Sequence, residues 1–225
     1  PYIKLNYTDT LDDAFTLAHE LGHAMHSYFS NRKQTYANSD YRIMVAEVAS
    51  TCNEVLLTKY LLSVEKDPMR RAYILNHFLE GFRTTVFRQT LFAEFEYNVH
   101  QMYEEGTPLT PDSLSETYED LLKLYYDGAA VPEVMRYEWS YIPHFYRAFY
   151  VYKYATGFSS AVAIANNILE TGDASKYLEF LSLGGSDYPV EELRVAGINL
   201  DDPETVKSAL KVFDETIDEL ADLLK

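Results

Sequence analysis

The chain has 225 residues, which is enough for one domain with a sizeable core. Its formal net charge of −16 argues against nucleic acid and anionic membranes as partners, and no apolar run approaches the length of a membrane span. The lone cysteine, Cys52, excludes an internal disulfide and is compatible with a reducing compartment, so we expect a cytoplasmic protein.

The N-terminal segment gives the only strand signal in the sequence. Residues Tyr2–Asn6 alternate well enough for a short edge strand, which either pairs with the backbone of a bound peptide or is a frayed stump. Thr10 follows as a suitable N-cap, with Asp12 and Asp13 in the first helical turn, where carboxylates favour the helix dipole. We therefore expect the first helix to begin directly after Thr10.

The run HELGH at His19–His23 lies in the middle of this first helix. His19 and His23 are four residues apart, so both imidazoles project from one face and can bind a single Zn²⁺. Glu20 points about 100° away, close enough to act as general base on a metal-activated water without being a ligand. His26 lies on the ligand face and is a candidate to support the ligands. The alternative is a pair of ordinary histidines on an amphipathic helix.

A second helix is expected beyond a polar loop. The loop covers residues 31–40, and either Ser39 or Asp40 can cap a helix over residues 41–62. The first half of this helix is largely apolar, yet Glu47 stands in it, and a buried carboxylate is costly unless its charge is compensated. A metal dication would compensate it, and the alternative is an ordinary surface glutamate.

A catalytic zinc site needs a third protein ligand and one open position. We assign the third ligand to Glu47. Glu54 lies seven residues further along the same face, and we interpret it as a group that orients one of the histidines. Ser50 and Thr51 compete with Glu54 for that role.

The rest of the chain keeps a helical pattern of apolar residues, interrupted by breaks that contain glycine and proline. Thr110 and Pro111 read as the N-cap and first residue of one of these helices. We expect helices over residues 69–105, from 111 to the break at 128–132, and over 143–170, 174–183, 190–196 and 203–224. The sequence therefore predicts one all-α domain over residues 1–225, with at most a short edge strand at its N-terminus.

Several stretches in this order resemble the M3 family of zinc metallopeptidases, in particular the oligoendopeptidase F type. Those in the first quarter of the chain are PYIKLN (1–6), TLAHELGHAMHS (16–27) and AEVASTCNE (46–54). Those in the second half are YIPHFY (141–146), YVYKYATG (150–157) and GGSDYP (184–189). The similarity spans nearly the whole chain, which makes it far more specific than HELGH alone.

The resemblance implies an endopeptidase that cuts short, unstructured oligopeptides in a deep channel between two helical halves. Carried over by position, His19, His23 and Glu47 are the ligands of one Zn²⁺, and Glu20 is the general base. The ligating glutamate of the family lies in the Glu-Val-Ala-Ser block, which favours Glu47 over Glu54.

A tyrosine-rich segment supplies candidates for stabilising the oxyanion of peptide hydrolysis. Six tyrosines lie between residues 137 and 154, together with His144, and the resemblance implies donors in this block. On a helix, His144 and Tyr152 share a face, so we expect these two closest to the scissile carbonyl, followed by Tyr146 and Tyr150. The alternative for each tyrosine is packing in the core or in a groove.

Members of the family are generally much longer than this chain. We therefore expect it to be the C-terminal catalytic part of a larger oligopeptidase, with the N-terminal half of the same enzyme as a partner. The alternative is an inactive helical peptide-binding fragment that lacks the other channel wall. Apolar surface left by that half would also favour self-association. An extracellular thermolysin-like protease is disfavoured, because acidic clusters of the calcium-binding type are absent.

Overall fold

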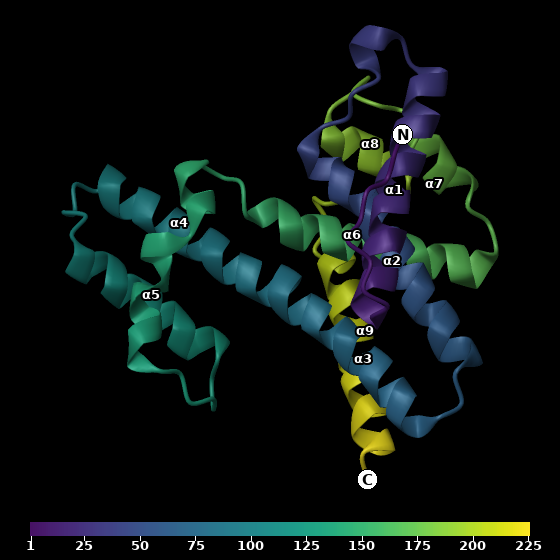
Figure 1. Cartoon of the computed structure of the whole chain (residues 1–225). Coiled ribbons are helices and arrows are strands. Elements are labelled where there is room, and N and C mark those ends of the chain that lie inside the picture. Colours follow the sequence, from purple (N-terminus) through teal and green to yellow (C-terminus); the bar gives the residue numbers. More distant parts are fainter. The chain divides into compact units, whose positions relative to one another are not determined.

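The computed structural model describes residues 1–225, and every regular element in it is helical. The α-helices are α1 (Leu11–Lys33), α2 (Ile43–Val64), α3 (Pro68–Phe82), α4 (Arg88–Glu104), α5 (Pro111–Tyr125), α6 (Tyr152–Thr171), α7 (Ser175–Phe180), α8 (Pro189–Val195) and α9 (Glu204–Leu223) (Figure 1). Shorter helical segments are η1 (Tyr36–Asn38), η2 (Arg83–Phe87), η3 (Glu133–Tyr141) and η4 (Pro143–Tyr146). The predicted all-α class is confirmed.

Residues Tyr2–Asn6 form no strand within the chain, which agrees with the prediction of at most a short edge strand there. A strand is held by hydrogen bonds to a neighbouring strand, and this structure offers none for residues 1–10 to pair with. Thr10 caps α1 as expected, since its side chain accepts from the Asp13 amide while the Asp13 carboxylate accepts from the Thr10 amide.

The chain divides into two compact units. The first comprises Pro1–Phe82 and Thr156–Lys225, and the second comprises Arg83–Ala155. The long helix expected over residues 69–105 is interrupted at this boundary by η2, a π-helical segment between α3 and α4. Such segments contain wider turns that apolar spacing alone does not distinguish from α-helix.

In the first unit, α1 packs along α2 (Figure 1). The α2 side chains Val45, Val48 and Cys52 are fully buried, so this helix lies in the middle of the core. Further along the core, the Phe82 ring contacts the ring of Phe158 at a centroid distance of 4.8 Å. Burial of the α2 side chains therefore holds α2 in place beside α1.

The connection between α1 and α2 differs in detail from the expected one. The N-cap of α2 is Arg42, which makes no capping hydrogen bond with its side chain, so the expected caps Ser39 and Asp40 are wrong. Tertiary contacts hold this segment instead. The Gly185 amide donates to the Asn38 carbonyl at 2.9 Å, and the Ser30 hydroxyl donates to the Ser39 carbonyl at 2.5 Å.

The second unit is built around an aromatic core on α4, α5 and η3. The rings of Phe95 and Tyr118 meet edge to face at 5.2 Å. The Tyr118 hydroxyl donates to the buried Glu138 carboxylate at 2.6 Å, and Arg88 forms an ion pair with the same carboxylate. A carboxylate buried in this way is compensated by both partners, which ties η3 to α4 and α5.

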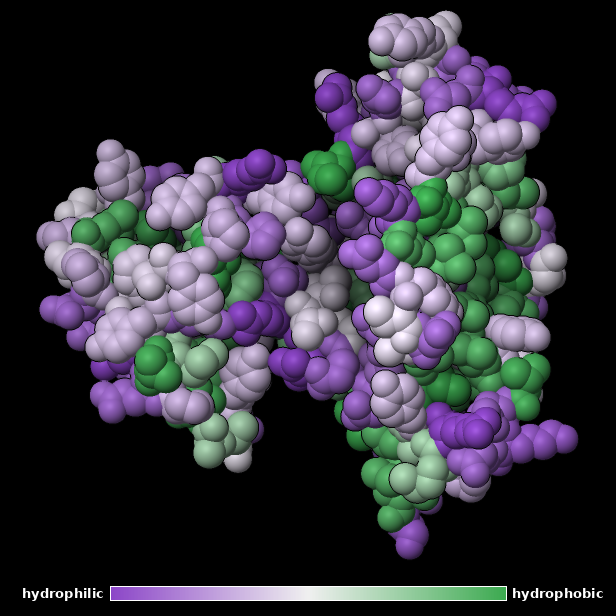
Figure 2. Space-filling view, in the orientation of Figure 1, coloured by the Kyte–Doolittle hydropathy of each residue, from purple (hydrophilic) through white to green (hydrophobic).

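The surface of the first unit displays a broad area of apolar side chains (Figure 2). On α1, Leu17 and Leu21 are 38% and 45% exposed. This surface is consistent with the predicted self-association, which stays a prediction. None of the helices combines the length and the apolar character that a membrane span requires.

Candidate metal centre

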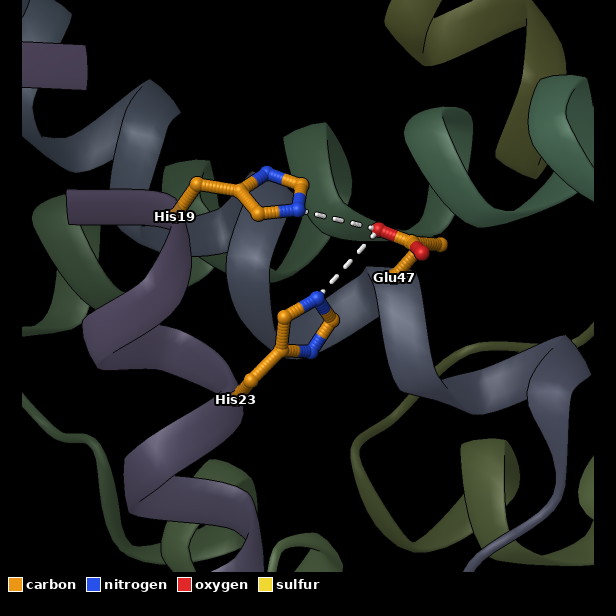
Figure 3. Close-up of side chains that lie close together, drawn as sticks. All are labelled: His19, His23 and Glu47. Atoms are coloured by element: carbon orange, nitrogen blue, oxygen red, sulfur yellow. Dashed lines mark ion pairs between the residues drawn. The ribbon is translucent and has the colours of Figure 1, made fainter. Parts of the chain in front are cut away.

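Figure 3 shows the imidazoles of His19 and His23 pointing from α1 towards the carboxylate of Glu47 on α2. His19 Nε2 lies 3.3 Å from Glu47 Oε2, and His23 Nε2 lies 3.7 Å from the same oxygen. The potential ligand atoms of the three side chains all lie within 4.8 Å of one another. The structure thus brings together the three residues predicted to bind zinc.

The close approach of the two helices depends on Gly22, which lies between the two histidines in sequence. A Cβ atom at this position would lie 2.5 Å from the Ala49 carbonyl oxygen and 2.5 Å from the Ser50 Cα atom. Both are backbone atoms, so no side-chain adjustment relieves the clash. Only a glycine allows α1 to lie this close to α2 and places His19 and His23 opposite Glu47.

Glu54 occupies the supporting position proposed for it. His19 Nδ1 and Glu54 Oε1 are 2.6 Å apart. When the imidazole is neutral, Nδ1 must carry the proton in this contact, since an ionised carboxylate only accepts. The lone pair then lies on Nε2, the nitrogen that faces Glu47.

Neither competitor for this role, Ser50 or Thr51, forms a side-chain hydrogen bond with a histidine. The Ser50 hydroxyl lies 3.1 Å from Glu47 Oε2 and 3.0 Å from the Glu47 carbonyl oxygen, so it steadies Glu47. Thr51 is buried in α2 and forms no side-chain hydrogen bond. Of the three candidates, Glu54 alone is therefore within hydrogen-bond distance of His19.

The site concentrates negative charge around His19. Burial lowers the pKa of this imidazole, but the carboxylates of Glu47 and Glu54 outweigh that effect and raise the pKa to about 10. The neighbouring His19 in turn lowers the pKa of Glu47, against the effect of its burial. Without a cation, His19 therefore keeps a proton between the two carboxylates, and a metal ion has to displace that proton to bind.

The distances from Glu47 to the two imidazoles match those between ligand atoms around a tetrahedral metal ion. Zn–N and Zn–O bonds of about 2.1 Å in a tetrahedral site place the ligand atoms about 3.4 Å apart. The separations of 3.3 Å and 3.7 Å found here are close to that value. Two imidazoles and a carboxylate are also the donor set that suits Zn²⁺, with one position left for water or substrate.

Glu20 and His26 have contrasting surroundings on α1. Glu20 is partly exposed and takes part in no hydrogen bond or ion pair with the rest of the chain, so its carboxylate is available as a base. His26 is only 1% exposed, and its ring stacks on Tyr41 with a centroid distance of 3.6 Å. Burial lowers the pKa of His26 to about 3, so the ring is neutral.

The support that His26 gives to the site is indirect. No hydrogen bond links it to His19, His23 or Glu47. The Tyr41 hydroxyl, on the ring that His26 stacks against, lies 3.4 Å from the His23 carbonyl oxygen. His26 therefore packs against Tyr41, whose hydroxyl reaches the backbone of a proposed ligand, and forms no hydrogen bond with the imidazole of that ligand.

The tyrosine-rich segment has a different conformation from the helix expected over residues 143–170. Only η4 and α6 are helical in this range, and Phe149 between them has a left-handed φ of 55°. An α-helix cannot continue through such a residue. The expected alignment of His144 with Tyr152 on one helical face is therefore wrong.

His144 is grouped with two other residues instead. Its ring stacks on Tyr150 at a centroid distance of 5.6 Å, and its Nε2 atom lies 3.3 Å from the Tyr154 hydroxyl. Tyr154 is absent from the candidate donors that the sequence suggests, although it belongs to the same stretch. Tyr146 is 88% exposed. All of these side chains belong to the second unit, and their role as oxyanion donors stays a prediction.

Known proteins are similar in sequence to this chain over its whole length. The sequence profile of peptidase family M3 matches residues 1–212. Oligopeptidase PepF of Bacillus subtilis is 49% identical over 227 residues, which is 100% of this chain and 34% of that protein. Chromosomal oligoendopeptidase F of Lactococcus lactis subsp. cremoris is 44% identical over 228 residues, covering 100% of this chain and 38% of that protein.

The fold is shared as well. The crystal structure of oligoendopeptidase-F from Enterococcus faecium superposes with a TM-score of 0.85 and 47% sequence identity, covering 95% of this chain and 39% of that one. The chain spans 34% and 38% of the length of the two curated relatives above. With a family profile that matches nearly all of it, the chain belongs to peptidase family M3.

Proposed function

We propose that this chain carries the metal centre of a zinc-dependent endopeptidase that hydrolyses short, unstructured oligopeptides. The observation that carries the proposal is the convergence of His19 Nε2, His23 Nε2 and Glu47 Oε2 beside an unpaired Glu20. Family membership and the names of the relatives support it. The chain corresponds to the C-terminal catalytic part of such an enzyme, which works together with an N-terminal half.

Each residue of the proposed site has its own role in hydrolysis. His19, His23 and Glu47 would hold the Zn²⁺, which when bound would supply Lewis acidity for a carbonyl oxygen and for water. Glu20 accepts the proton of the attacking water and returns it to the leaving amine. Glu54 keeps the Nε2 lone pair of His19 directed at the metal position by holding the proton on Nδ1.

Stabilisation of the oxyanion is assigned to the tyrosine-rich segment. His144, Tyr152, Tyr146 and Tyr150 are proposed donors, and Tyr154 joins them because its hydroxyl lies within hydrogen-bond distance of His144. Hydroxyl and imidazole donors of this kind act on charge that develops only in the transition state.

Cytoplasmic localisation of the protein also remains a prediction.

Metal analysis of single variants tests the ligand assignment. We expect one Zn²⁺ per wild-type chain and almost none in Glu47→Ala, because that variant lacks a ligand. Glu54→Ala should keep most of its zinc, with an affinity reduced about 10- to 100-fold, since it removes only a supporting group. Equal loss of zinc from both variants, or loss from Glu54→Ala alone, contradicts the assignment of Glu47.

Peptide turnover distinguishes the enzyme from a non-catalytic peptide-binding fragment. Orientation of the substrate by both halves contributes strongly to rate, so we expect this chain alone to cleave a fluorogenic oligopeptide at least about 10²-fold more slowly than a protein extended by the upstream region. Zinc binding without turnover in either form supports the non-catalytic alternative. Equal activity in both forms contradicts the need for two halves.

A further inference from the structure

The second unit contains a pocket of about 240 Å³ whose walls are mostly aromatic and aliphatic. The aromatic wall is formed by Phe95, Phe145 and Trp139, with centroid distances of 5.3 Å from Phe95 to Phe145 and 6.3 Å from Phe95 to Trp139. The polar residues that line the pocket are Glu96, His100, Ser140 and Tyr146. All of these residues belong to the second unit, which contains none of the proposed metal ligands.

Glu96 is the unusual member of this lining. The residue is only 7% exposed, and its carboxylate accepts a single hydrogen bond, from the Phe149 amide to Oε1 at 2.7 Å. No cation of the chain forms an ion pair with it. A carboxylate has about four acceptor positions, and a buried one is costly unless it is compensated. Glu96 therefore has unused acceptor capacity at the wall of an apolar pocket.

Three further residues of the lining, His100, Ser140 and Trp139, already use their side-chain donors within the chain. His100 Nδ1 donates to the Glu96 carbonyl oxygen at 2.7 Å, which leaves Nε2 as an acceptor when the ring is neutral. The Ser140 hydroxyl donates to the Tyr137 carbonyl oxygen at 2.8 Å, and the indole N–H of Trp139 donates to Ser115 Oγ at 3.1 Å. The Tyr146 hydroxyl can donate or accept a hydrogen bond. The other polar side chains offer a ligand only acceptors, and the aromatic ones offer their ring faces.

We propose that this pocket binds the side chain of an arginine in a peptide ligand. A guanidinium carries five donors and a permanent positive charge, which match the free acceptors of Glu96, His100 and Ser140. Its planar group also packs well against aromatic rings such as Trp139, and its aliphatic stem suits the apolar walls. The peptide nature of the ligand rests on the proposed function, whereas the choice of arginine rests on the pocket alone.

Trp139 makes the test direct, because it is the only tryptophan of the chain and it lines the pocket. The full chain is titrated at low salt with acetylated and amidated Gly-Arg-Gly, while tryptophan emission is recorded. The matched peptides contain citrulline, which keeps the shape without the charge, or norleucine, which keeps only an apolar chain. Mass spectrometry of the recovered peptides scores binding separately from cleavage, so a failure of the proposed peptidase activity does not affect the result.

We expect a saturable change in emission with the arginine peptide and about tenfold or more weaker binding of both matched peptides. Glu96→Gln keeps an acceptor for the Phe149 amide and should remove this preference. Glu104→Gln, an equal change of charge at the end of α4, should leave it intact. Equal binding of the arginine and citrulline peptides, measured on the unmodified chain, overturns the proposal. So does equal binding of the norleucine peptide, which would mark a purely apolar cleft, or no change in emission with any peptide.

Discussion

The three acidic side chains that we assign to the site, Glu47, Glu54 and Glu20, differ in their surroundings, and their proposed tasks follow from that difference. Glu47 faces both imidazoles, and Glu54 is bonded to the far nitrogen of His19. Glu20 has no partner in the chain and is thus the one carboxylate that can exchange a proton without breaking an existing contact. The proposed role of Glu20 in proton transfer rests on this difference.

Substitution of Glu20 by glutamine should separate metal binding from catalysis. The amide is nearly isosteric with the carboxylate but cannot take up the proton, so we expect zinc content to stay at the wild-type value. The kcat/KM for a fluorogenic oligopeptide should fall by at least about 10²-fold, measured in a form of the protein that cleaves it. Asp12→Asn, a matched loss of charge at the start of α1, is the control. A variant with Glu20→Gln that retains activity within tenfold of wild type removes Glu20 from the mechanism.

At this scale, the sequence predicts those relationships that are local in the chain. His19 and His23 share a face because four residues separate them on a helix, and Glu47 stands out as a charge on an apolar stretch. The contact between His144 and Tyr154 could not be predicted in this way. It depends on the left-handed backbone of Phe149, and bulky residues rarely adopt that conformation.

At the scale of elements, the crossing of α1 and α2 leaves no room for a side chain at Gly22. We expect Gly22→Ala to destabilise the first unit by about 1–3 kcal/mol, because the new methyl group pushes the two helices apart. The same displacement separates His19 and His23 from Glu47 and should weaken zinc binding. Thermal unfolding and a zinc titration with a competing chelator measure the two effects.

Gly81→Ala provides the matched control. A Cβ atom at this position on α3 would meet only the Phe158 ring, at an ordinary distance of 3.5 Å. Alanine is the better helix former, so this variant should keep its zinc affinity and gain up to about 1 kcal/mol of stability. If both variants behave alike, the close helix crossing is not what positions the metal ligands.

The start of α1 should make stability depend on pH through Asp13. Its carboxylate accepts hydrogen bonds from Thr10 and Thr8, which hold the pKa of Asp13 well below its usual range. A lowered folded-state pKa contributes stability that is complete above the unfolded value of 3.8 and is lost as the pH falls towards the folded value. We therefore expect Asp13→Asn to lower Tm at pH 7 and to differ less from wild type at pH 3.

The comparison is best made in the presence of a chelator, since protonation of metal ligands would otherwise add its own pH dependence. Asp12→Asn removes the same charge from the same helical turn without removing a capping contact, and it should have a much smaller effect at pH 7. A constant difference in Tm between wild type and Asp13→Asn from pH 7 to pH 3 contradicts this account.

The sequence predicts the start of a helix where the capping residue and its partner are close in the chain. It does not predict the start where tertiary contacts determine it. Thr10 and Thr110 both form capping boxes, each within four residues of sequence. The N-cap of α2, Arg42, makes no capping hydrogen bond with its side chain, and the segment before it is held by a hydrogen bond from the amide of the distant Gly185. A similar limit applies to η2, whose π-helical turns leave the apolar spacing continuous from α3 to α4.

At the scale of the whole molecule, metal removal should destabilise one unit and spare the other. All three proposed ligands lie in the first unit, so a bound ion stabilises that unit by about 4 kcal/mol at a free concentration 1,000 times its Kd. We expect a chelator to lower the Tm recorded by far-ultraviolet circular dichroism. Zn²⁺ should restore it, whereas Mg²⁺, which prefers oxygen ligands, should not.

Tryptophan emission provides the internal comparison, because Trp139 lies in the second unit. We expect the transition recorded by Trp139 to be little changed by the chelator. His23→Ala should abolish the response of the first unit to Zn²⁺. A chelator effect that persists in His23→Ala would place the stabilising metal elsewhere.

The short connection between α1 and α2 also bears on the order in which the chain folds. The contact between His19 and Glu54 closes a loop of 35 residues. The contact between the Tyr177 hydroxyl on α7 and the Ala49 carbonyl oxygen on α2 closes a loop of 128 residues. Closing the longer loop costs about 1 kcal/mol more in chain entropy. The helical hairpin that contains the proposed ligands can therefore assemble before the C-terminal helices return to it. Zinc captured at that stage would act as a nucleus on which the rest of the first unit condenses.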